Sequence, residues 1–201
     1  MKHSVCIVGG CGHIGLPLGI ALASAGARVK LLDNSAKRVQ SVAEGRMPFL
    51  ERGADESLAE VLADGSLSVT TDPDAVGGSD AAVVTIGTPV DEFLSPQILR
   101  STVFPGVTER LDRRCRERGL RIDVAHCPER IAQGFALEET GSLPQIIGGV
   151  TPTATRRASA LFSLLGPRLI DIPPVEAELC KLFCNTYRYI NFAIANQFYV
   201  I

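Results

Sequence analysis

The sequence lacks any apolar run long enough to cross a lipid bilayer, although 46% of its 201 residues are apolar. The apolar stretch before Gly10 is too short for a secretory signal peptide. An excess of positive charge is also missing, because the formal net charge is −2, and this argues against broad attraction to nucleic acid or an anionic membrane. We therefore expect a cytoplasmic protein that binds neither nucleic acid nor a membrane.

Cysteine pairs typical of metal or redox sites are missing as well. The six cysteines, at positions 6, 11, 115, 127, 180 and 184, form no Cys-x-x-Cys pair, and the three histidines form no ligand cluster. Internal repeats and low-complexity tracts are also absent. We expect reduced thiols, as in cytoplasmic proteins, and no bound metal ion.

The sequence does contain an alternation of short apolar runs with helix-length segments. Strands are expected at 5–8, 27–32, 81–86, 98–103, 120–124 and 145–150, and helices at 14–25, 35–44, 153–165 and 175–201. This order predicts an α/β fold of the Rossmann-like, doubly wound type, with a mostly parallel sheet. We expect one domain over residues 1–174. The long helix 175–201 shows no stop signal, so we expect the natural chain to continue.

One connection departs from this pattern. Only about ten residues, rich in turn formers, separate the strand expected to end near Gly87 from the strand expected to begin near Gln97. A parallel crossover normally needs a dozen or more residues. Either these two strands are antiparallel or a segment is missing from the sequence. We predict the second, as a break between Pro96 and Gln97.

The strongest local signal is the run Gly10-Cys11-Gly12-His13-Ile14-Gly15, which follows a strand and opens a helix. In a G-x-G-x-x-G turn the first glycine allows the tight turn, the second lets a pyrophosphate approach the backbone, and the third lets the helix pack against the strand. The helix N-terminus then offers free N–H groups to the phosphates. Asp33 ends the second strand 18 residues after Gly15, where an acid is needed for the adenosine ribose.

These features predict a site for NAD. The Asp33 carboxylate would repel the 2′-phosphate of NADP, although Lys37 and Arg38 lie close enough to soften that preference. A glycine-rich turn without a ligand and a site for another nucleotide, such as FAD, are the alternatives.

Five motifs in a fixed order then extend over the whole chain. They are Gly10 to Pro17, Gly87-Thr88-Pro89, Ser101-Thr102-Val103 with Pro105-Gly106, Cys127-Pro128-Glu129-Arg130-Ile131, and Ala177-Glu178-Leu179-Cys180-Lys181 followed by Asn185. With them the sequence resembles the UDP-glucose/GDP-mannose dehydrogenase family. His13 replaces the usual tyrosine of the opening motif, and the Cys-Pro-Glu-Arg stretch points to the UDP-N-acetyl-D-mannosamine/glucosamine 6-dehydrogenase branch.

The resemblance implies a reaction and an architecture. Members of the family oxidise the C6 alcohol of a nucleotide sugar to a uronate with two NAD per turnover, in polysaccharide biosynthesis. Two Rossmann-like domains flank a long helix, which also forms a homodimer. A cysteine in a Gly-Gly-x-Cys context of the second domain captures the aldehyde, and no such context occurs in these 201 residues. The resemblance therefore implies that residues 1–174 are the NAD-binding domain, that 175–201 begin the connecting helix, and that the C-terminal domain is absent from this chain.

The resemblance also implies roles for individual residues. The cofactor-binding set is Gly10, Gly12, His13, Ile14, Gly15, Asp33, Thr88 and Thr102. The catalytic set is Lys181, Asn185 and Glu129, and the substrate-binding set is Arg130, Ile131, Lys181, Asn185 and Arg188. Lys181 and Asn185 would hold a developing oxyanion, and Glu129 would assist the attack of water. Some relatives carry a second glutamate where this chain has Gln133, which leaves the acid–base assignment open.

Each of these roles has a simpler structural alternative. Lys181 and Asn185 could belong to a solvated helix face, Glu129 could lie on the surface, and Thr88 and Thr102 could be plain turn residues. Among functions, the alternatives to a UDP-N-acetylhexosamine enzyme are a UDP-glucose or dTDP-glucose 6-dehydrogenase, a non-catalytic NAD-binding subunit, and a hydroxyacid-type dehydrogenase. The lack of a plausible catalytic histidine argues against the last.

Overall fold

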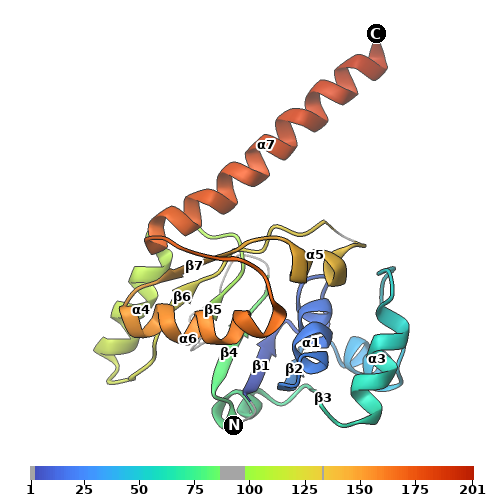
Figure 1. Ribbon diagram of the computed structural model, residues 1–201, viewed down its shortest axis with the longest axis vertical. Coiled ribbons are helices and arrows are strands. Elements are labelled where there is room, and N and C mark those ends of the chain that lie inside the picture. The colour runs from blue at the N-terminus through green and yellow to red at the C-terminus, as the bar shows by residue number, and fades with distance from the viewer. Residues whose placement is uncertain (1–2, 87–97, 133) are drawn as a thin grey trace.

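A single sheet lies at the centre of the computed structural model, which describes residues 3–86, 98–132 and 134–201 (Figure 1). Its strand order is β3-β2-β1-β4-β5-β6-β7-β8. The strands are β1 (Ser4–Val8), β2 (Arg28–Leu32), β3 (Leu67–Thr70), β4 (Ala81–Val84), β5 (Ile98–Leu99), β6 (Ala125–His126), β7 (Gln145–Gly149) and β8 (Leu169–Asp171). Among the described strands only the β6–β7 pair is antiparallel. The α/β fold with a mostly parallel sheet is confirmed, and the order of the first six strands is that of a doubly wound nucleotide-binding sheet.

Helices cover the sheet and extend beyond it. They are α1 (Gly15–Ser24), α2 (Ala36–Ala43), α3 (Ala54–Ala63), α4 (Val107–Glu117), α5 (Ala136–Ser142), α6 (Pro152–Phe162) and α7 (Pro174–Val200), with 3₁₀ turns η1 (Pro73–Gly78) and η2 (Ser163–Leu165). In Figure 1, α1 and α6 lie in front of the sheet, and α7 runs away from it as a long rod. Within the described residues, no helix combines the length and apolarity that a membrane span requires.

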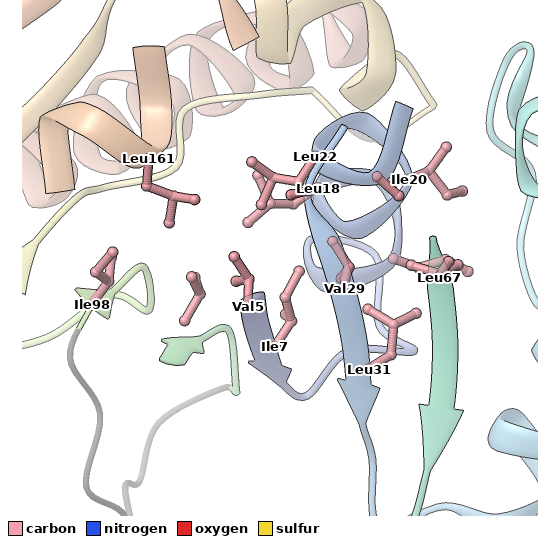
Figure 2. Close-up of a cluster of buried hydrophobic side chains, with 14 of the residues drawn as sticks. Val5, Ile7, Leu18, Ile20, Leu22, Val29, Leu31, Leu67, Ile98 and Leu161 are labelled. Atoms are coloured by element: carbon pink, nitrogen blue, oxygen red, sulfur yellow. The ribbon is translucent and has the colours of Figure 1, made fainter. Parts of the chain in front are cut away.

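The core follows from the alternation of side chains along the central strands. Val5 and Ile7 of β1 point to the face covered by α1, while Cys6 and Val8 join a smaller cluster on the opposite face. Figure 2 shows the larger cluster, in which strand residues such as Val29 and Leu31 meet Leu18 and Leu22 of α1. Because both faces of the sheet are covered at β1, the sequence of this strand is a continuous apolar run rather than an alternation of apolar and polar residues.

Several elements differ from the sequence-based expectation. The strand expected at 120–124 is wrong, because Leu120 is 40% exposed and pairing with β5 begins only at Ala125, opposite Ile98. The sequence pattern also gave no indication of α3, α4, α5, β3 and β8. In α4 the buried residues are Thr108, Asp112 and Cys115, so this helix shows no apolar stripe in its sequence.

The connection between β4 and β5 bears on the expected chain break. The two strands pair in parallel, with Val83 opposite Ile98 and Val84 opposite Leu99, so the antiparallel alternative is wrong. The predicted break between Pro96 and Gln97 lies outside the described residues.

Candidate active site

The glycine-rich loop connects the carboxyl end of β1 to α1 at the centre of the sheet. The residue in the left-handed region is Gly9, with φ of 80°, so the tight turn depends on Gly9 rather than on Gly10 as expected. Gly10 is instead required by close approach, since a Cβ there would lie 2.7 Å from Cβ of Leu31. A Cβ on Gly15 would lie 2.5 Å from the Gly9 carbonyl oxygen, which agrees with close packing of the helix against the strand. Gly12 is less crowded, since a Cβ there would lie 3.3 Å from the Gly9 carbonyl oxygen, and its own N–H donates to that oxygen at 3.2 Å.

Asp33 follows β2 and is buried against the glycine-rich loop. Its Oδ2 accepts the Cys11 N–H at 3.1 Å, and its Oδ1 accepts the Ser35 N–H at 3.0 Å. The carboxylate therefore connects the loop after β1 to the loop after β2. Each oxygen keeps acceptor capacity for a further donor, such as a ribose hydroxyl.

An ion pair joins the segment after β6 to the first half of α7. Lys181 Nζ lies 3.1 Å from Oε2 of Glu129 and also donates to the Glu129 backbone carbonyl. Both side chains are buried, so neither belongs to a solvated surface. The other carboxylate oxygen of Glu129, Oε1, is buried and has no hydrogen-bond partner among the described residues. A buried acceptor of this kind is unusual and suits a substrate hydroxyl or a water molecule.

Along α7, Glu178, Lys181, Asn185 and Arg188 follow one another at spacings of three or four residues and form a polar stripe, which runs from the buried Lys181 to the exposed Arg188. Asn185 Nδ2 approaches Oγ1 of Thr102 at 3.5 Å, which places a proposed catalytic residue beside a proposed cofactor residue. One turn further along, Arg188 is exposed. Arg130 is half-buried and donates to the Pro144 carbonyl.

A cavity of about 1000 Å³ brings the glycine-rich loop and α7 together. Its described lining residues are Gly12, His13, Ile14, Thr85, Glu129, Arg130, Ile131, Ala132, Glu139, Asn185, Arg188, Tyr189 and Phe192. Residues from the cofactor, catalytic and substrate sets therefore share one space. Five residues of these sets do not line the cavity: Gly10, Gly15, Asp33, Thr102 and Lys181. Thr88 and Gln133 lie outside the described residues.

Two buried polar residues near this site were not predicted from the sequence. Arg100 donates from Nη1 to Oε1 of Gln145 at 2.8 Å, and its guanidinium lies 5.1 Å from the ring centroid of Phe162. His126 of β6 is fully buried, and neither ring nitrogen has a partner among the described residues. Burial, with the charges of Arg100 and Lys181 nearby, lowers the pKa of His126 to about 4. The sequence gives no clear signal for either residue, since Arg100 follows directly after β5 and His126 lies beyond the strand expected at 120–124.

A third unpredicted role belongs to Glu178, which the sequence places three residues before Lys181 on the same stripe. Its buried carboxylate accepts the Thr108 N–H at 2.7 Å and also receives the Gly106 N–H. Glu178 thus supplies the N-terminal cap that α4 lacks in its own sequence. This contact fixes α7 against the domain close to Lys181.

The cysteines near the site are poor nucleophiles. Burial raises the pKa of the Cys127 thiol to about 12, and burial together with Asp33 raises that of Cys11 to about 12. Cys127 is also fully buried, so we interpret it as a packing residue. Within residues 3–86, 98–132 and 134–201, no group of three or more His, Cys, Asp or Glu residues could hold a metal ion.

Comparison with known proteins gives a consistent set of relatives. Residues 3–98 and 95–165 match the NAD binding domain of the UDP-glucose/GDP-mannose dehydrogenase family. The UDP-N-acetyl-D-mannosamine dehydrogenase of Pyrococcus horikoshii is 32% identical over 215 aligned residues, covering 94% of this chain and 51% of that protein. The solved structure of the UDP-D-ManNAc dehydrogenase from that organism has a TM-score of 0.87 at 30% identity, covering 98% of this chain and 53% of the other. A UDP-glucose dehydrogenase structure from Pyrobaculum islandicum has a TM-score of 0.86 at 25% identity, covering 98% and 52%.

Two facts about length accompany these similarities. The chain spans about half the length of the curated relatives it matches. The alignment with the Pyrococcus horikoshii protein also extends over 215 positions, more than the 201 residues of this chain. That relative therefore contains residues, within the aligned region, that have no counterpart here.

Proposed function

The chain belongs to the UDP-glucose/GDP-mannose dehydrogenase family, and from this premise we propose that it contributes the NAD-binding half of a nucleotide-sugar 6-dehydrogenase. The reaction is the oxidation of a C6 alcohol to a uronate, with a UDP-N-acetylhexosamine as the favoured substrate. The observation that supports this most is the cavity in which Gly12 to Ile14 face Glu129 and Asn185. The sugar is inferred from the Cys-Pro-Glu-Arg stretch and from the activities named for the N-acetylmannosamine relatives. A UDP-glucose or dTDP-glucose substrate remains the alternative.

The residues present fit NAD. The cavity-lining loop at Gly12 and the first turn of α1 would receive the pyrophosphate, and Asp33 would accept hydrogen bonds from the adenosine ribose. His13 and Ile14 line the same cavity, and Thr102 lies behind it next to Asn185. Bound NAD supplies the acceptor for the hydride that leaves C6.

Glu129, Lys181 and Asn185 then act on the sugar. Oε1 of Glu129, buried and without a partner, accepts a hydrogen bond from the substrate hydroxyl or from water and is placed to take up its proton. Asn185 offers its amide N–H groups to the oxygen on C6. Lys181 holds the Glu129 carboxylate at 3.1 Å, and its positive charge favours negative charge developing nearby. Arg130, Ile131 and Arg188 line the side of the cavity that receives the rest of the nucleotide sugar.

The organisation of the chain follows the same proposal. Residues 1–174 form the NAD-binding domain, and 175–201 begin the helix that connects it to a second domain. The second half of α7 carries exposed aromatic side chains, including Tyr187 at 71% and Phe198 at 72% exposure. Side chains of this kind suit a homodimer contact along the helix.

The chain is expected to bind NAD more tightly than NADP. Asp33 is buried, and a 2′-phosphate beside it would bring two negative charges into a poorly solvated site. Titrating the protein with both cofactors, with Asp33→Asn as the comparison, measures the preference, which should narrow in the variant. Tighter binding of NADP by the unsubstituted chain would refute the role of Asp33.

The same chain is expected to bind NAD and yet fail to make the uronate. The four-electron oxidation needs a nucleophile that holds the aldehyde for a second hydride transfer. No cysteine here stands in a Gly-Gly-x-Cys context, and burial raises the pKa of the Cys11 and Cys127 thiols to about 12. The test follows NADH absorbance for residues 1–201 with UDP-N-acetylmannosamine, UDP-N-acetylglucosamine and UDP-glucose. Sustained turnover to the acid would contradict the proposal.

A further inference from the structure

The segment between α2 and α3 contains a buried carboxylate, that of Glu51, which belongs to none of the motifs found in the sequence. Glu51 is 5% exposed. Its Oε2 accepts the Gly134 N–H at 3.1 Å and its Oε1 accepts the Leu137 N–H at 3.3 Å, across 83 and 86 residues of sequence. Because a buried carboxylate is costly unless it is hydrogen-bonded, these two contacts hold the segments firmly together.

The neighbour of Glu51 adds two contacts to the same partner segment. The Arg52 N–H donates to the Gly134 carbonyl at 3.3 Å. The Arg52 guanidinium lies over the ring of Phe135, 4.7 Å from its centroid. Backbone, charge and aromatic contacts therefore converge on Gly134 and Phe135, shortly after the cavity-lining residues Arg130 to Ala132.

The other end of this segment reaches the glycine-rich loop. The ring of Phe49 lies 4.0 Å from the ring of His13, centroid to centroid, at an interplanar angle of 35°. His13 lines the cavity on the side proposed for the cofactor. Residues 49–52, named here the bridge segment, therefore contact both walls of the cavity.

We propose that Glu51 is a positioning residue, which through the bridge segment holds the substrate-side loop, residues 130–132 and 134–135, at a fixed place across the cavity from the glycine-rich loop. The identity of the ligands in that cavity rests on the proposed function, whereas the contacts of Glu51 and the bridge segment do not depend on it. Glu139 is a local anchor of the same loop, since its carboxylate accepts the Ala132 N–H at 2.6 Å from seven residues away. Glu51 differs because it connects the loop to a separate part of the chain.

The test is the substitution Glu51→Gln. Glutamine has nearly the same shape, but it can offer a carbonyl oxygen to only one of the two N–H groups and turns an NH₂ donor toward the other. The matched control is Glu60→Gln, which removes the same charge from an exposed position on α3. Amide hydrogen exchange at Gly134 and Leu137, followed by NMR, should become about tenfold faster or more in Glu51→Gln and stay unchanged in Glu60→Gln.

A second measurement separates positioning from a general loss of structure. Titration of NAD and then of UDP-N-acetylmannosamine, with amide signals as reporters, should give an NAD Kd within about twofold of the unsubstituted protein and a nucleotide-sugar Kd raised about fivefold or more. Unchanged exchange at Gly134 and Leu137 would overturn the proposal. So would faster exchange with an unchanged nucleotide-sugar Kd, or an equal loss of affinity for both ligands. If the unsubstituted chain binds no nucleotide sugar, the proposed function is wrong, and the exchange rates alone decide whether Glu51 anchors the loop.

Discussion

Replacing Lys181 with methionine is expected to lower the free energy of unfolding by about 3–5 kcal/mol at neutral pH. Lys181 is the cation paired with Glu129, and both side chains are buried. Methionine fills much the same space but leaves the carboxylate without its partner, while Oε1 of Glu129 already lacks one among the described residues. Denaturant unfolding of the two proteins measures the difference.

Two further variants separate this cause from others. The double variant Lys181→Met with Glu129→Gln should recover part of the lost stability, because the carboxylate left unpaired by the first substitution is then neutral. The recovery should be incomplete, because the buried Arg100 guanidinium also interacts with the Glu129 charge. Arg188→Met removes an exposed cation from the same helix and should change the free energy of unfolding by no more than about 0.5 kcal/mol. A single variant as stable as the original chain would show that the pair is not a buried ion pair in solution.

The stability of the fold is expected to fall as the pH is lowered from about 6.5 to about 4, with His126 contributing about 3 kcal/mol of the loss. Burial, together with Arg100 and Lys181, lowers the pKa of His126 to about 4 in the folded protein. Above pH 6.5 the imidazole is neutral in both states. Between the two pKa values only the unfolded chain takes up the proton, so unfolding becomes easier, and below pH 4 the contribution levels off.

The substitution His126→Leu isolates this contribution, since carboxylates also titrate in the same range. Leucine carries no titratable group, so the difference in unfolding free energy between the two proteins should shift by about 3 kcal/mol in favour of the variant between pH 7 and pH 4. Denaturant unfolding at several pH values provides the measurement. Parallel curves for the two proteins would contradict this account, because they would mean that His126 has the same pKa in the folded and unfolded states.

Parts of the site with a local chemical cause could be predicted from the sequence. The glycine-rich turn, the strand before it and Asp33 after β2 follow from the short-range geometry of a βαβ unit. The polar stripe of α7 follows from helical spacing, and Glu178 and Lys181 both lie on the face that meets the domain. That Lys181 pairs with Glu129 could not follow from spacing, because 52 residues separate them. Only the resemblance to a family placed them at one site.

Other parts depend on tertiary contacts that leave little trace in the sequence. Glu51 contacts residues more than 80 positions away, and Arg100 meets Gln145 across 45. His126 reads as one polar residue in a short strand, and its burial follows from the covering of both sheet faces. The strand expected at 120–124 was wrong because Leu120 is exposed and pairing with β5 begins only at Ala125, opposite Ile98.

The most direct test of the account is a crystal structure of the chain with NAD. We expect the adenosine ribose at Asp33, the pyrophosphate over Gly12 and the start of α1, and the nicotinamide ring in the cavity beside Asn185, close to Glu129. That result would place the hydride acceptor next to the residues proposed to act on C6. NAD bound elsewhere, or with its nicotinamide directed away from Asn185 and Glu129, would contradict it.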